Sequence, residues 1–156
     1  MLYPVMKAPL ITALGAVLFC SVLSTSSAQH YQSALGLRGG TGANVSYKKF
    51  VSRPLAIEAI LGSFDYDYFG SSILLEKHTD IDLGRVQWYW GLGPYITFAR
   101  DFTGFGAMGA LGLDLSFESI PIEISLDWTP RLRLAGASAG LFADSAGVGL
   151  RYIIEY

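Results

Sequence analysis

The residues most able to do chemistry are charged side chains that recur at alternate positions of otherwise apolar segments. They are Arg38, Lys48, Glu58, Glu76, Asp114, Glu123, Asp127, Arg131 and Arg151. Alternate side chains of a β-strand point to one face of the sheet, so this spacing predicts that all nine share a face. If that face is enclosed, the charges must pair, because breaking a buried pair costs about 3–5 kcal/mol. Two functions fit such a set: a polar plug that fixes the shape of a barrel, or a narrow path for ions.

Histidine is the other candidate for chemistry, because nucleophilic catalysis would pair it with a serine and an acidic residue. The chain has two histidines, His30 and His78. His30 falls at the start of the expected mature chain, and His78 falls in Glu76-Lys77-His78-Thr79-Asp80, near a predicted turn. Neither lies in a cluster with the spacing of metal ligands. A structural role is therefore expected for both, with no catalytic residue, no cofactor and no metal site.

Eight segments of alternating apolar and polar residues must position these side chains. They are predicted as strands over residues 31–38, 43–50, 55–64, 71–78, 86–98, 106–117, 120–133 and 146–156. Glycine, proline and aspartate separate them, and the longest predicted loop covers residues 135–145. One boundary stays open, because residues 39–42 fit either a hairpin turn or a kink in one long strand. The pattern predicts an all-β fold: an eight-stranded, antiparallel, up-and-down transmembrane β-barrel.

The contents of the two faces decide which one lies inside the barrel. Alternation alone also fits a soluble barrel of the lipocalin type, in which the apolar face is enclosed. Here the face opposite the charges is rich in leucine, isoleucine and tryptophan, whereas the charged face also carries Gly36, Gly112 and Gly149. Glycine weakens a solvent-facing strand but fits the crowded interior of a small barrel. The polar face is therefore expected inside and the apolar face against lipid.

Both ends of the chain fit a secreted membrane protein. Residues 1–28 combine Lys7, an apolar run and small residues before Ala28, which predicts a cleaved signal peptide. The remaining domain, residues 29–156, contains no cysteine and has 10 basic residues against 13 acidic ones. This balance gives no reason to expect a nucleic-acid partner. The final strand alternates and ends on Tyr156, with the length that a barrel strand needs to cross a membrane.

Aromatic residues near the predicted strand ends would form girdles at the two membrane surfaces. The candidates are Tyr31, Trp88, Phe98, Phe117, Trp128 and Tyr156. Tyr66, Tyr68 and Phe69, in a predicted loop over residues 65–70, are candidates for contact with a surface partner whose identity the sequence does not give. Pro94 lies within a predicted strand, where it removes a ladder donor and would weaken the seam with a neighbouring strand.

Five segments together carry a family resemblance: GLRGG with VSYKKF, LEKH, WYWGLGPYITF, IEISLDWTPRL and GVGLRY. In this order the chain resembles the small outer-membrane barrels of the OmpX/OmpA-like class, and within it the short barrels of Bacteroidetes-type bacteria. The resemblance implies an outer-membrane location, with both termini periplasmic and membrane lipids as partners. It also implies that the barrel assembly machinery recognises the C-terminal strand.

The function expected from these observations is structural, or contact with a surface partner, without enzymatic activity. Two alternatives remain open: a narrow pore for ions or small solutes, and a lipid A-modifying barrel enzyme. The resemblance itself implies a fold and a location, and no firmly assigned activity.

Overall fold

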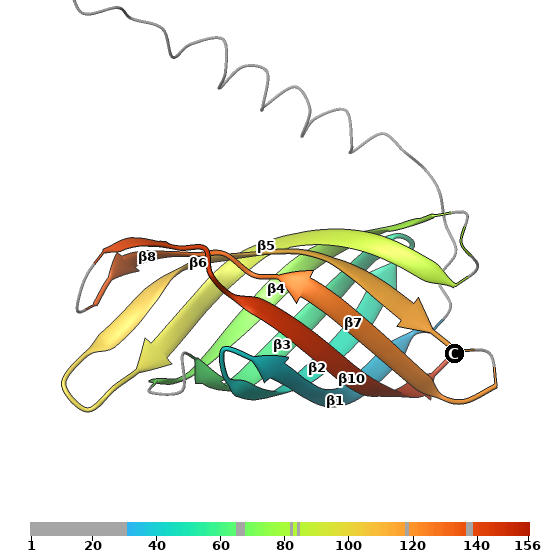
Figure 1. Cartoon of the computed structure of the whole chain (residues 1–156), viewed down its shortest axis with the longest axis horizontal. Helices are drawn as coiled ribbons and strands as arrows, with labels where there is room; N and C mark the ends of the chain where they lie inside the picture. Colours follow the sequence, from blue (N-terminus) through green and yellow to red (C-terminus); the bar gives the residue numbers. More distant parts are fainter. Residues whose placement is uncertain (1–30, 65–67, 82, 84, 118, 137–138) are drawn as a thin grey trace, which may run out of the picture.

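The computed structural model of this chain describes residues 31–64, 68–81, 83, 85–117, 119–136 and 139–156. The predicted signal peptide, His30 and Tyr66 lie outside the described residues. The described chain is all-β and forms a closed, antiparallel, eight-stranded barrel (Figure 1). Among the described residues, no helix has the length and apolarity needed to cross a membrane.

Ten strand segments build the barrel. They are β1 (Ser33–Gly40), β2 (Ala43–Ser52), β3 (Leu55–Phe64), β4 (Tyr68–Asp80), β5 (Val86–Phe98), β6 (Thr103–Ser116), β7 (Ile122–Trp128), β8 (Arg131–Ala135), β9 (Gly140–Phe142) and β10 (Ala146–Glu155). Each strand from β1 to β6 pairs with the next, and β10 pairs with both β7 and β1. The pairing of β10 with β1 closes the barrel. β8 continues the pairing of β7 along β6, and β9 pairs with β8 as β10 pairs with β7. Because β7 with β8, and β9 with β10, each form one barrel strand, the ten segments amount to eight barrel strands.

The open question about residues 39–42 is answered by the pairing of β1 with β2. The two strands are antiparallel, and Gly39 lies opposite Ala43. The segment is therefore a hairpin turn, and the alternative of a single kinked strand does not apply. The predicted boundaries of β3 and β5 agree with the structure, whereas β4 begins at Tyr68 instead of residue 71.

Two predictions for the last third of the chain are wrong. The predicted strand over residues 120–133 is broken at Thr129 and Pro130, since proline has no N–H with which to continue a ladder. Thr129 N–H bonds to the Ser145 carbonyl and Gly109 N–H bonds to the Pro130 carbonyl, so the chain stays bonded to both neighbouring segments across the break. The predicted loop over residues 135–145 contains β9, which pairs with β8. β9 has only three residues, which are too few to show the alternating pattern that predicts a strand.

The barrel wall separates an apolar exterior from a polar interior, which we call the lumen. Outward side chains such as Leu37 and Leu126 are 68% and 58% exposed. Inward positions on the same strands hold buried charged and hydroxyl groups, with two apolar clusters between them. The larger cluster contains Ile60, Phe64, Leu74, Tyr89, Tyr95, Met108 and Ala110.

Pro94 coincides with an interruption in the wall. The ladder between β4 and β5 runs from Phe69 to Ser72 and resumes at Leu75, so Ile73 and Leu74 lack ladder partners opposite Gly93 and Pro94. On its other side Pro94 stays in register with Ala107 of β6. An outer-wall groove of about 310 Å³ lies at this interruption.

Candidate functional site

Arg151, on the closing strand β10, is the centre of a network of charged side chains in the lumen. Its Nη1 donates to both carboxylate oxygens of Glu123, each at 2.8 Å, and to Ser125 Oγ at 2.9 Å. Its Nη2 binds the Glu58 carboxylate, and its Nε donates to Ser46 Oγ at 2.7 Å. One guanidinium therefore joins β10 to β2, β3 and β7. Such charge-assisted bonds are stronger than neutral ones.

Arg38 extends the network toward the β1–β2 hairpin. Its Nη2 binds the Asp127 carboxylate, and its Nη1 lies 3.7 Å from a Glu58 oxygen. The Tyr89 hydroxyl donates to the other Asp127 oxygen at 2.6 Å. Asp127 is thus held by one cation and one hydroxyl from different strands.

Lys48 holds two further carboxylates. Its Nζ lies 3.0 Å from Glu76 and 3.4 Å from Asp114, and 4.4 Å from the centre of the Tyr89 ring. Attraction between the ammonium group and the ring adds to the two ion pairs. Lys48 is fully buried, so these contacts replace all of its water.

His78 lies inside the barrel beside the same carboxylates. Its Nε2 is 3.0 Å from Glu76, and its ring stacks on Tyr89 with the ring centres 4.9 Å apart. On another side it packs against Phe50, at 4.8 Å between ring centres. The ring therefore fills space in the core as well as carrying a polar contact.

Tyr31 was expected in an aromatic girdle on the outer wall, and that expectation is wrong. It is 2% exposed, its ring packs against Phe50, and its hydroxyl donates to Asp114 at 2.9 Å. A register shift between Ser33 and Ala34, the first two residues of β1, reverses the alternation there and turns Tyr31 inward. Burial, and then the adjacent Asp114 carboxylate, raise the pKa of the Tyr31 phenol well above its usual value.

Glycines on the inward face make room for the large charged side chains. A Cβ on Gly149 would lie 2.3 Å from Ser125 Oγ and 3.1 Å from Arg151 Nη1. A Cβ on Gly112 would lie 2.9 Å from the Tyr89 ring. These positions explain why glycine shares a face with the charges.

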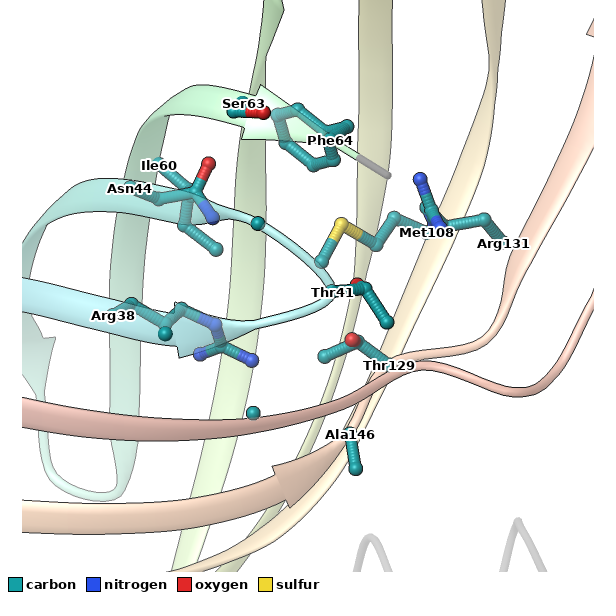
Figure 2. Close-up of a pocket in the computed structure, with 13 residues that line it drawn as sticks. Arg38, Thr41, Asn44, Ile60, Ser63, Phe64, Met108, Thr129, Arg131 and Ala146 are labelled. Atoms are coloured by element: carbon teal, nitrogen blue, oxygen red, sulfur yellow. The ribbon is translucent and has the colours of Figure 1, made fainter. Parts of the chain in front are cut away.

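Arg131, the ninth predicted charge, contacts a serine and an aromatic ring on the inner face of the barrel. Its Nη2 donates to Ser145 Oγ at 2.9 Å, and its guanidinium lies 5.7 Å from the centre of the Phe64 ring. With Arg38 it lines a small cavity beside the β1–β2 hairpin, which Figure 2 shows in close-up. The cavity holds about 20 Å³ of free space, enough for one water molecule.

The other predicted surface residues lie at several places on the molecule. Phe98, Trp128 and Tyr156 are exposed on the outer wall, while Trp88 and Phe117 are half-buried. Phe69 is exposed at the start of β4. Tyr68 is half-buried and packs against Phe102, with 5.5 Å between ring centres.

Several lumenal partners were not predicted from the sequence. Ser46 and Ser125 bind Arg151, Tyr89 binds Asp127, and Arg133 is buried near the loop end of the barrel. Ser46, Ser125 and Tyr89 lie at alternate positions in step with the charged residues of their strands. This spacing was the sequence signal that they share the inward face. Pairing across strands depends on the register, which periodicity alone does not give.

Searches of protein-family models, curated proteins and solved structures find no match to this chain. Within the described part of the chain, no group of three or more histidine, cysteine, aspartate or glutamate residues could hold a metal ion.

Proposed function

We propose that this chain is a small outer-membrane β-barrel protein with a plugged polar lumen and a structural or surface-interaction role, without enzymatic activity. The observation that carries the proposal is the outer wall. Large apolar side chains are exposed on every long strand, from Leu35 on β1 to Ile154 on β10. Monomeric soluble proteins rarely expose a contiguous apolar surface larger than a few hundred Å². Such an apolar outer wall matches the hydrocarbon interior of a lipid bilayer, and membrane barrels present an apolar band of this kind.

The packing of the lumen favours a plugged barrel as the function, in preference to a pore. Arg151, Lys48, Glu58, Glu76 and Glu123 are each less than 2% exposed. A water-filled path through the barrel would wet these groups, which lie at its centre and bind one another. An eight-stranded barrel has an interior just wide enough for side chains to fill.

The two ends of the described chain lie at the same end of the barrel, as the proposed orientation requires. Gln32 N–H bonds to the Glu155 carbonyl, so the start of β1 and the end of β10 lie side by side. In the proposed orientation this end is periplasmic, which is the arrangement of single-chain bacterial barrels. The C-terminal strand β10 closes the barrel by pairing with β1, and it is the strand that we propose the assembly machinery recognises.

Reconstitution into phospholipid vesicles tests the plug and the membrane location together. We expect the protein to float with vesicles and to stay with them at high salt, because its outer wall is held by apolar contact. We also expect planar bilayers that contain it to show no stable conductance steps. Recovery of the folded protein free of lipid would contradict the location, and reproducible steps would favour the narrow pore.

A further inference from the structure

An apolar groove on the outer wall spans strands β3, β4 and β5. Its volume is about 340 Å³, which is within the range of sites that bind small molecules. Leu75 of β4 pairs with Leu92 of β5, and these two side chains are 53% and 59% exposed on the outward face. The groove is lined by Leu55, Leu75, Glu76, Lys77, Trp90 and Leu92. Most of this lining is apolar, so the groove fits a hydrocarbon chain.

Lys77 of β4 places a positive charge within this apolar lining. It lies in register between Leu55 of β3 and Trp90 of β5, two residues along the strand from Leu75. The neighbouring Glu76 carboxylate points the other way and belongs to the lumenal network. Lysine packs its methylene chain along an apolar surface and directs its ammonium group to polar surroundings. The groove therefore joins apolar side chains to a cation.

Other basic residues lie near the same end of the barrel. Lys49 of β2 is exposed on the outward face, two strands away from Lys77. Arg53 is exposed in the turn that leads from β2 into β3. Asp80, at the end of β4, lies on the inward face, where it accepts a hydrogen bond from Gln87 at 2.8 Å. The outward charges that these residues present beside the groove are therefore positive.

We propose that this groove, which we call the Lys77 groove, binds an anionic phospholipid. The acyl chain lies along Leu75 and Leu92, and the phosphate lies beside the Lys77 ammonium group. An ammonium group only donates hydrogen bonds, and phosphate oxygens accept them and balance its charge. Basic residues near a membrane surface attract anionic lipids, and tryptophan is enriched at the same level. The proposal rests on the membrane location proposed above.

Quenching of Trp90 tests the proposal, because bromine on the acyl chains of a lipid quenches a tryptophan that it contacts. Trp88→Phe combined with Trp128→Phe leaves Trp90 as the only tryptophan of the chain. The full chain is placed in vesicles of phosphatidylcholine and phosphatidylglycerol in equal amounts, and either one lipid or the other carries the bromine. We expect phosphatidylglycerol to be preferred at Trp90 about fivefold, which is the effect of one basic residue at an anionic surface.

Three variants and a second tryptophan serve as controls. Lys77→Gln should abolish the preference, and Lys77→Arg, which keeps the charge, should retain it. Lys49→Gln changes an exposed side chain and should lower the preference, which keeps the test decisive if Lys77→Gln does not fold. A protein with Trp128 as its only tryptophan should be quenched equally by the two lipids. Trp128 pairs with Ala146 at the start of β10, at the opposite end of the barrel.

The possible failures can be told apart. Equal quenching of Trp90 by the two lipids would overturn the proposal, since the groove would then accept any acyl chain. A preference that both glutamine variants leave unchanged, or that Trp128 shares, would also overturn it, because the anionic lipid would then gather around the whole barrel. Absence of quenching by either lipid would contradict the membrane location itself, and the groove proposal with it.

Discussion

Replacing Arg151 with leucine is expected to lower the free energy of unfolding by about 3–5 kcal/mol. The substitution removes the cation that binds both Glu58 and Glu123 in the lumen. Both carboxylates are fully buried, so water cannot replace the lost contacts without opening the barrel. Urea unfolding in lipid vesicles measures the change.

Two further variants separate the ion pairs from the loss of an arginine as such. Arg53→Leu removes an exposed arginine in the β2–β3 turn and should change the stability by less than about 0.5 kcal/mol. Combining Arg151→Leu with Glu123→Gln should recover part of the loss, because one stranded charge is then removed. An Arg151→Leu protein as stable as the unaltered one would contradict the network.

Replacing Gly36 with valine is expected to prevent the barrel from closing. Gly36 lies opposite Arg151 where β1 meets β10. A Cβ at this position would be 2.0 Å from the Leu150 carbonyl oxygen and 2.4 Å from Arg151 Cα. Both atoms belong to the backbone, so the two strands would have to separate. The cost should reach or exceed about 3 kcal/mol, the upper end of the usual range for overpacking.

Gel mobility of unboiled samples reports this closure, since a closed barrel resists detergent and migrates apart from the boiled chain. The Gly36→Val protein should lack the folded band. Gly39→Val is the matched control, because it places the same side chain on β1 where nothing lies within 4 Å. Equal folded bands for the two variants would show that the close approach of the backbones at Gly36 does not control closure of the barrel.

The alternation of residue types was enough to predict the barrel and its eight strands, because each strand has two faces in different surroundings. It also gave the parity of Ser46, Ser125 and Tyr89, although their partners depend on cross-strand register. What it missed depends on local departures from period two. The shift at Ser33 moves Tyr31 from the expected outer wall into the lumen.

The break at Pro130 and the strand β9 could not be read from periodicity either. Proline could be accommodated at the edge of a ladder or break it, and the outcome depends on the neighbouring strands. β9 is held by main-chain pairing with β8, and its three residues are too few to show a pattern.

The central claim, that the outer wall faces lipid, is tested most directly by tryptophan fluorescence. The chain has three tryptophans, Trp88, Trp90 and Trp128, and all three lie on the outward face of their strands. In vesicles whose acyl chains carry bromine, which quenches tryptophan on contact, we predict strong quenching, together with weak quenching by iodide in the water. Emission that is unaffected by bromine but quenched by iodide would contradict the account.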